Sequence, residues 1–141
     1  MRHHHTESCT GFTLIELLIV ISIIGIIAAM VISSYSNASQ DSREVVVMQQ
    51  QAVLQSALDD WIANSSSISS AQTTYNATSG SQARLNLIKG YLDDLTTAQF
   101  STTNTSQGFL QSDVMQKTSQ YVSFGDWTSG SYPKVQINNV P

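Results

Sequence analysis

Residues capable of covalent or metal chemistry are concentrated at the start of the chain. Three histidines, His3, His4 and His5, and the one cysteine, Cys9, precede residue 10. Imidazole and thiolate groups are the usual nucleophiles, general bases and zinc ligands of proteins. If this stretch is removed, the rest of the chain has no disulfide, no thiol or imidazole catalysis and no His- or Cys-ligated metal.

Two pairs of adjacent carboxylates are the remaining candidates for catalysis: Asp59 with Asp60, and Asp93 with Asp94. A general acid and a general base have to face one another across a substrate. Each pair lies in a segment predicted to be helical, where neighbouring side chains diverge. We therefore interpret both pairs as solvated helix faces, and we predict no catalytic residue, no cofactor and no enzymatic activity.

One further carboxylate lies inside the run Leu14–Ile32, which is apolar except for Glu16, Ser22 and Gly25. As a helix this run spans about 28 Å, close to the hydrocarbon thickness of a bilayer, and it predicts a transmembrane helix. A secretory signal peptide would place its small-residue cleavage site after the apolar run. Here a small residue comes before the run instead.

The position of Glu16 has two interpretations. An ionised carboxylate inside a bilayer costs several kcal/mol, which makes Glu16 a candidate functional residue with a partner cation to be found. The alternative is that Glu16 lies close enough to the membrane surface to stay hydrated. Position alone leaves both interpretations open.

The helix that carries Glu16 is predicted to continue well beyond Ile32, because neither Pro nor Gly occurs from Val31 to Asn64. The pattern predicts one helix of about 50 residues, apolar all round in its first half and amphipathic in its second. The apolar face of the second half consists of four residues widened by three others: Val47, Leu54, Leu58 and Trp61, with Val45, Met48 and Ala52.

The next segments predict a loop and a second helix. Asn64–Ser81 is rich in Ser and Thr, which compete with backbone hydrogen bonding, and we expect an exposed loop there. Gln82–Phe100 predicts a second amphipathic helix, with Gly90 as an unfavourable residue in its middle. Phe109–Met115 fits either a short helical turn or a strand. The apolar side of the second helix contains Leu85, Ile88, Leu92 and Leu95, with Tyr91 beside them.

The C-terminal tail predicts an antiparallel β-hairpin. Tyr121, Val122 and Phe124 are followed by a turn at residues 128–131, after which apolar residues at 135, 137 and 140 alternate with polar ones. The apolar face of the hairpin has to be buried, and the amphipathic half of the long helix is the obvious partner. The predicted fold class is α+β: a long N-terminal helix packed on a small globular domain with a second helix and a C-terminal hairpin or small sheet.

Length and charge exclude other classes of protein. The sequence has 141 residues, enough for one ordinary domain and an appendage. Its six Lys and Arg residues are scattered singly among ten Asp and Glu, so the phosphate-neutralising cluster of a nucleic-acid-binding protein is absent. Charged residues are only 11% of the chain, a balance that suits an extracytoplasmic surface.

The segment around Glu16 reads G-F-T-L-I-E-L-L from Gly11 to Leu18. It closely resembles the processing and methylation motif of type IV pilins and type II secretion pseudopilins. The resemblance continues through Gly25 and Met30 to Tyr35. Beyond that point it extends only to architecture, a long N-terminal helix followed by a small domain with a terminal antiparallel sheet.

The resemblance implies specific roles for three residues. Prepilin peptidase would cut after Gly11 on the cytoplasmic face, and the new amine of Phe12 would be N-methylated. Glu16 would neutralise the Phe12 amine of a neighbouring subunit during assembly. Both charges would lie in an apolar helical bundle, where their attraction is large and each is costly without the other. The implied divisions are a leader at 1–11, a transmembrane or filament-core half of the helix at 12–35 and a pilin-like globular domain at 36–141.

The same resemblance implies partners and a location. The partners would be other copies in a helical filament, other pilin-like subunits, prepilin peptidase, an inner-membrane assembly platform and, before assembly, membrane lipid. The chain would cross the inner membrane once, with its N-terminus cytoplasmic and its C-terminal domain periplasmic. It would then join a filament in the periplasm or on the cell surface.

Three features depart from the pattern of these families. The leader has Arg2 as its one firm cation, so orientation is not set by the positive-inside rule. Ser33 stands where many pilins have proline, and the cysteine pair that closes the C-terminal loop of many pilins is missing. Major pseudopilins tend to hold calcium there with carboxylates, and Asp126 or Asp113 would be the candidates. No Asp-rich loop is visible, a solvated turn is the ordinary interpretation of Asp126, and we predict no metal.

The favoured function is that of a structural filament subunit, and the lack of cysteines after the leader favours a type II secretion pseudopilin. One alternative is a true type IV pilus subunit for adhesion, motility or DNA uptake. Another is a monomeric membrane-anchored module that binds a ligand through its Ser-rich loop or hairpin. That module would leave Glu16 without a partner.

Overall fold

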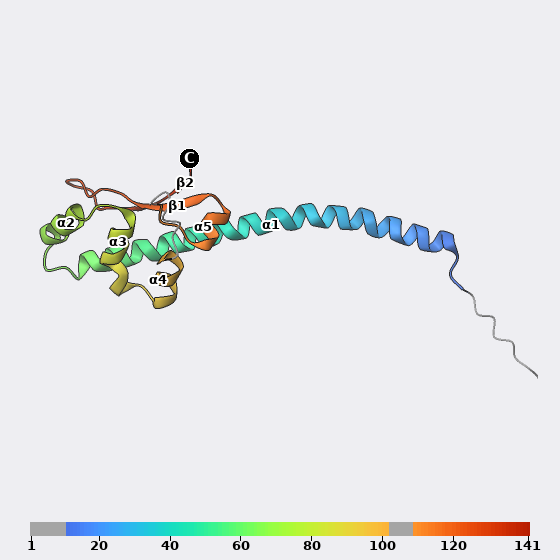
Figure 1. Ribbon diagram of the computed structural model, residues 1–141, viewed down its shortest axis with the longest axis horizontal. Helices are drawn as coiled ribbons and strands as arrows, with labels where there is room; N and C mark the ends of the chain where they lie inside the picture. The colour runs from blue at the N-terminus through green and yellow to red at the C-terminus, as the bar shows by residue number, and fades with distance from the viewer. Residues whose placement is uncertain (1–10, 102–108) are drawn as a thin grey trace, which may run out of the picture. The chain divides into compact units, whose positions relative to one another are not determined.

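The computed structural model describes residues 11–101 and 109–141, and it divides into two compact units. The boundary lies between Ser39 and Gln40, inside the long helix α1, Leu14–Ala63. This helix has 50 residues, as the absence of Pro and Gly after Val31 predicted. Figure 1 shows α1 entering the C-terminal unit, where the other helices and both strands lie.

The described part of the first unit consists of the start of α1 and the few residues before it. Every apolar side chain there is exposed, from Phe12 at 86% to Tyr35 at 76%. By length and composition α1 is able to cross a membrane. The expected apolar segment is therefore part of a helix.

The second unit is built around the C-terminal half of α1. Val47, Leu54 and Leu58 are buried as the spacing predicted, and Trp61 packs against this core while remaining partly exposed. The prediction that three further residues extend this buried apolar face is wrong. Val45 and Met48 are each 64% exposed, and Ala52 is exposed as well. The helix instead buries Ala57 and Ile62.

The segment predicted as an exposed loop contains a helix, α2, Ile68–Ala77, and the prediction is wrong there. Ser67 caps this helix, because its hydroxyl accepts a hydrogen bond from the backbone N–H of Ser70 at 3.1 Å. Ala71 and Tyr75 are buried on one side, four residues apart. Burial of a tyrosine outweighs the weak helix propensity of the surrounding Ser and Thr residues.

The single helix predicted over residues 82–100 is also wrong, because the chain forms three elements there. They are α3, Ser81–Ile88, a short 3-10 turn η1, Lys89–Tyr91, and α4, Asp94–Ser101. The interruption falls at Gly90, and Asp93 starts a new helix by accepting the backbone N–H of Thr96 at 2.8 Å. Leu85 and Ile88 are buried, whereas Leu95 is 78% exposed.

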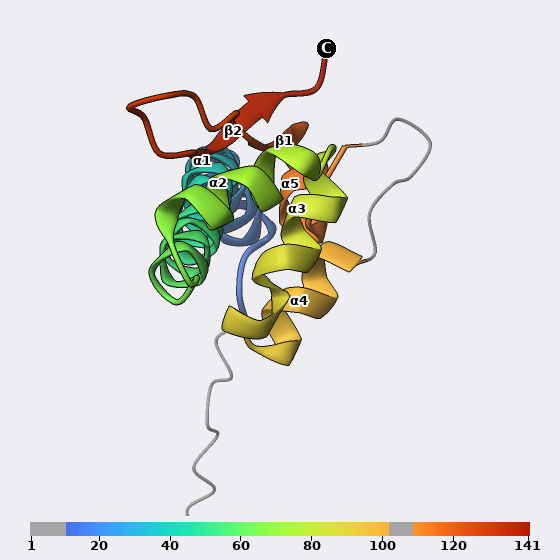
Figure 2. The same ribbon diagram turned by 90° about the vertical axis from the view of Figure 1, so that its left-hand side faces the viewer.

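The C-terminal residues form the predicted antiparallel hairpin. Strand β1, Gln120–Phe124, pairs with β2, Val135–Asn139, with Val122 opposite Ile137. Val122, Phe124 and Val135 face the core. Figures 1 and 2 show the hairpin on one side of the C-terminal unit and α4 on the opposite side.

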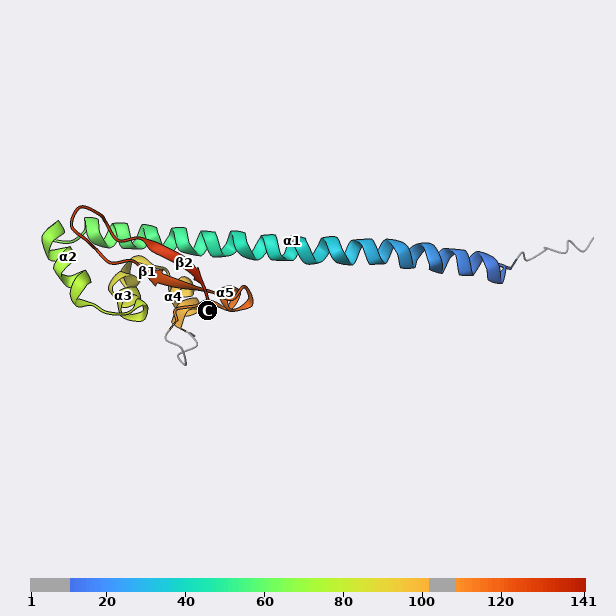
Figure 3. The ribbon, with the colours of Figure 1, turned by 90° about the horizontal axis from the view of Figure 1, so that it is seen from above.

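Contacts with α1 hold the hairpin in place. The side chain of Gln51 donates to the carbonyl of Val135 at 2.8 Å, and the backbone N–H of Val135 donates to Gln55 at 2.8 Å. Figure 3 shows both strands lying along the C-terminal half of α1. The expected partner of the hairpin is thus the observed one.

Phe109–Met115, which fitted either a turn or a strand, leads into the short helix α5, Asp113–Lys117. Ser112 caps α5, since its hydroxyl accepts from the backbone N–H of Met115 at 3.4 Å. Leu110 forms an isolated bridge with Val122 of β1. The segment therefore contains a single strand-like contact followed by a helical turn.

Candidate functional site: the start of the long helix

The N-terminal end of α1 carries a reciprocal capping arrangement between Thr13 and Glu16. The backbone N–H and the hydroxyl of Thr13 each donate to Glu16 Oε2, both at 2.8 Å. In return, the backbone N–H of Glu16 donates to the Thr13 hydroxyl at 3.3 Å. A Thr followed three residues later by Glu is a capping box, which satisfies backbone donors that the first helical turn leaves free.

The capping box gives Glu16 a local role, yet it leaves the carboxylate charge unbalanced. Both bonds from Thr13 reach Oε2, and no described residue donates to Oε1. No cation in the described ranges lies within ion-pair distance of Glu16 either. A neutral glutamine would fill the capping role equally well, so the negative charge itself has no partner in the described part of the chain.

Phe12 and Gly11 lie immediately before the capping box. The Phe12 side chain is 86% exposed. A Cβ atom added at Gly11 would meet nothing within 4 Å, and no positive φ is recorded for this residue. The described residues thus place no steric demand for glycine at position 11.

The loop between β1 and β2 is held by a second polar centre, the guanidinium of Arg84. It donates to the carbonyls of Thr78 at 3.0 Å and Phe124 at 2.7 Å, and to the carboxylate of Asp126 at 3.0 Å. It also lies 4.5 Å from the ring centroid of Tyr75, within the range of a cation–π contact. Several oxygens and one aromatic face thus surround a cation supplied by the chain itself.

Tyr75 completes this centre. Its hydroxyl donates to the carbonyl of Gly125 at 2.8 Å. Burial raises the pKa of Tyr75 to about 12, against the opposing effect of the Arg84 charge. The phenol therefore remains protonated, and able to donate, throughout the neutral range.

The two carboxylates considered for calcium do not form a cation site in the described residues. Asp126 is bound to Arg84, and its side chain is 84% exposed. Asp113 lies in the first turn of α5. The described ranges contain no group of three or more His, Cys, Asp and Glu residues that could hold a metal ion.

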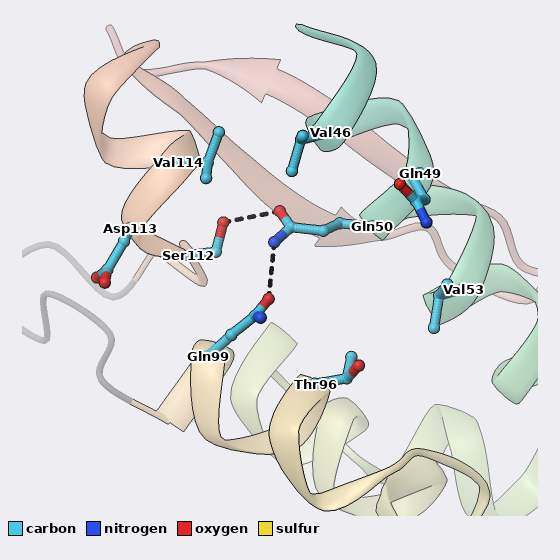
Figure 4. A pocket seen from close by; sticks show the side chains of 9 residues that line it. All are labelled: Val46, Gln49, Gln50, Val53, Thr96, Gln99, Ser112, Asp113 and Val114. Carbon is cyan, nitrogen blue, oxygen red and sulfur yellow. Dashed lines mark hydrogen bonds between the residues drawn. The ribbon is translucent and has the colours of Figure 1, made fainter. Parts of the chain in front are cut away.

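A hollow of about 400 Å³ lies between α1, α4 and α5, and Gln50 is among the residues that line it. Figure 4 shows Gln50 accepting a hydrogen bond from Ser112 at 2.7 Å and donating to Gln99 at 2.9 Å. Both ends of the Gln50 amide are therefore used within the protein. These hydrogen bonds connect α1, α4 and the start of α5. The three polar side chains that form them therefore have a structural role.

Two of these features were missed by sequence reasoning, for different reasons. The capping box has a sequence signal, a Thr three residues before a Glu at the start of an apolar run, and this signal lies within the G-F-T-L-I-E-L-L motif. Arg84 has no such signal, because Phe124 and Asp126 follow it by 40 and 42 residues. The functional roles expected for Gly11, Phe12 and Glu16 stay predictions.

Comparison with known proteins matches the N-terminal segment alone. The model of the prokaryotic N-terminal methylation motif matches residues 8–32, a range that includes Gly11, Phe12, the capping box and most of the exposed apolar segment. No curated protein and no solved structure matches the chain.

Proposed function

We propose that this chain, which carries the type IV pilin and pseudopilin signature at residues 8–32, is a structural subunit of a pilin-like filament. One observation carries the proposal: the signature coincides with a helical segment whose apolar side chains are all exposed and which is long and apolar enough to cross a membrane. Such a surface needs lipid or other protein around it. A subunit that leaves the membrane and joins a helical bundle meets both needs in turn.

The proposal assigns a processing role to the residues before the helix. Prepilin peptidase would cut the peptide bond after Gly11, which releases a leader of residues 1–11, and the amine of Phe12 would then be methylated. The open space around Gly11 supports this assignment, because the fold itself gives no reason for a glycine there. Residues 12–35 would form the membrane and filament-core segment, and residues 36–141 the globular domain.

Glu16 would pair with the Phe12 amine of a neighbouring subunit. The support is the unbalanced charge, since the capping box uses Glu16 Oε2 alone among the carboxylate oxygens. In an apolar bundle that charge and the amine would each be costly to bury alone, and breaking such a pair costs about 3 to 5 kcal/mol. The apolar helix and the signature are consistent with membrane anchoring; the orientation with the globular domain in the periplasm belongs to the proposal.

Two variants at position 16 separate capping from charge pairing. Glu16→Gln retains a side chain that completes the capping box but removes the charge, whereas Glu16→Ala removes both. We expect both variants to reach the membrane and be processed, and both to fail in assembly. Filament yield by electron microscopy is compared with the amount of processed protein, and Thr13→Ser, which keeps the hydroxyl, is the matched control.

Two outcomes would contradict the pairing role of Glu16. Normal filaments from Glu16→Gln, with a defect in Glu16→Ala, would reduce Glu16 to a helix cap. Normal filaments from both would remove the pairing role altogether. An antibody against the globular domain has to trace the variant chain itself, because a minor subunit can be lost from a filament that still forms.

Within this proposal a type II secretion pseudopilin is favoured over a surface pilus subunit. No cysteine follows Cys9 to close the C-terminal loop, and hydrogen bonds from Arg84 hold that loop instead. Deletion of the gene should then block secretion of proteins across the outer membrane and leave twitching and adhesion intact. The opposite pattern would favour the pilus.

A further inference from the structure

A groove beside the C-terminal half of α1 is centred on Asp59 and Tyr132. Two hollows, of about 510 and 540 Å³, share these two residues in their lining. One hollow extends toward Lys134 at the start of β2, and the other extends toward Ile68 at the start of α2. Together they provide an elongated surface with an aromatic ring and a carboxylate in the middle.

The ring of Tyr132 is exposed and yet supported from below. The residue is 54% exposed, and its ring centroid lies 5.5 Å from that of the buried Trp127. Trp127 in turn packs edge-on against Tyr75 at 5.9 Å. This series of aromatic contacts connects Tyr132 to the core, so the ring is a preformed flat surface.

The carboxylate of Asp59 is oriented by Gln55. The amide nitrogen of Gln55 donates to Asp59 Oδ1 at 2.9 Å, and the amide oxygen accepts from the backbone N–H of Val135 at 2.8 Å. No described residue donates to Asp59 Oδ2. One acceptor is therefore held in position and left available in the groove.

The charges along the groove select the class of ligand. Asp59 and Lys134 are the charged residues among those that line the two hollows, and their charges cancel. A carboxylate only accepts hydrogen bonds and an ammonium group only donates them, whereas each hydroxyl of a sugar does both. The electron-rich face of an aromatic ring attracts the weakly positive C–H groups on the flat side of a sugar ring.

We propose that this groove binds a neutral oligosaccharide. One sugar ring stacks on Tyr132, its hydroxyls donate to Asp59 and accept from Lys134, and the chain continues into both hollows. A peptide strand fits less well, because both main-chain groups of Val135 that face this side are already bonded to Gln51 and Gln55. This function is additional to the filament role and independent of it.

Calorimetric titration of the full-length chain tests the proposal, in micelles of an amine-oxide detergent that has no sugar headgroup. The probes are cellotetraose, maltotetraose and N-acetylchitotetraose, with a neutral Gly-Ser-Ala peptide of similar length for comparison. We expect at least one tetrasaccharide to bind with a Kd below about 1 mM. The peptide should bind more weakly than that sugar.

Matched variants locate the binding. Tyr132→Ala should weaken it by at least about tenfold, and Tyr132→Phe should stay within about threefold of the natural chain. Asp59→Asn should weaken it as well, whereas Asp60→Asn, one residue further along the helix and outside the lining, should not. Ile68→Arg, at an exposed position in the second hollow, gives an independent block if Tyr132→Ala fails to fold.

Three results would overturn the proposal. The first is no binding of any tetrasaccharide up to about 10 mM. The second is sugar binding of natural strength in folded Tyr132→Ala and Ile68→Arg. The third is a peptide that binds more tightly than every sugar and depends on the same residues, which would assign the groove to a protein partner.

Discussion

The two halves of α1 have similar helical backbones, but their leucine side chains differ in burial. Leu17, in the first half, is 59% exposed, whereas Leu58, in the second, is completely buried by its own chain. Apolar periodicity explains the second half, where one face meets a core and the other meets water. In the first half every face is apolar, and its apolar side chains are exposed.

The same contrast applies to the carboxylates that bind nearby threonines. Glu16 accepts from Thr13 at the start of α1, and Asp93 accepts from Thr96 at the start of α4. For Asp93, the cap explains the residue, because the surrounding surface is solvated. For Glu16, the cap leaves a charge at the head of an apolar helix. Local hydrogen bonds thus account for the carboxylate of Asp93. They account for the capping role of Glu16 but not for its charge.

Identical substitutions in the two halves of α1 give the largest expected contrast. Leu58→Ala should lower the free energy of unfolding of the C-terminal unit by about 2 to 5 kcal/mol, because it leaves a cavity in the core. Leu17→Ala should change it by less than about 0.5 kcal/mol. Urea unfolding is followed by fluorescence of Trp61 and Trp127, both of which lie in the C-terminal unit.

Equal effects of the two leucine variants would contradict this contrast. A large loss from Leu17→Ala would mean that the first half of the helix is packed against the C-terminal unit. A negligible loss from Leu58→Ala would mean that neighbouring side chains fill the cavity without lowering the free energy of unfolding. Far-UV circular dichroism of both variants controls for loss of the helix itself.

Substitution of Arg84 is expected to give the next largest loss of stability. It tests whether the contacts of Arg84 stabilise the C-terminal unit. Arg84→Ala should lower the free energy of unfolding by about 2 to 3 kcal/mol, because the carbonyls of Thr78 and Phe124 lose their donor. Arg84→Lys should recover only part of the loss, since an ammonium group lacks the planar fork. The same fluorescence assay measures both variants.

Asp126→Asn is the matched control for Arg84. The Asp126 carboxylate is largely exposed, so this variant should cost less than about 1 kcal/mol. A loss from Asp126→Asn as large as that from Arg84→Ala would show that the ion pair, rather than the carbonyl contacts, stabilises the loop. Addition of calcium should leave the stability of the natural chain unchanged.

The predictable parts of the fold depended on periodicity. The 50-residue length of α1 followed from the lack of Pro and Gly, and the hairpin followed from alternation around a turn. The secondary-structure predictions failed where a single residue had more influence on helix formation than the composition of its segment. Burial of Tyr75 makes a helix from a Ser- and Thr-rich segment, and the Asp93 cap restarts a helix after Gly90.

The candidate site was predictable only as a motif. The order of Gly11, Phe12 and Glu16 before and within an apolar run carries the signal, because a peptidase and a neighbouring subunit would read local sequence. The Arg84 centre could not be found in this way. Its acceptors meet only after α3 and the hairpin have packed together, and no local pattern encodes that encounter.

The smallest expected effect is a pH dependence at the start of α4. Hydrogen bonds from the hydroxyl and then the backbone N–H of Thr96 lower the pKa of Asp93 below its usual value. A lowered pKa in the folded state means that the stabilising contribution is present above the ordinary carboxylate pKa and is lost as the pH falls through the folded-state pKa.

In Asp93→Asn the amide oxygen can still accept the Thr96 N–H, but the amide nitrogen cannot accept the hydroxyl hydrogen. The variant should therefore be slightly less stable than the natural chain at neutral pH, and the two unfolding curves should converge in acid. Urea unfolding by tryptophan fluorescence from pH 7 down to about pH 3 measures this difference. A difference that stays constant over that range would mean that the Thr96 bonds do not favour the ionised form, and that Asp93 caps its helix without any use of its charge.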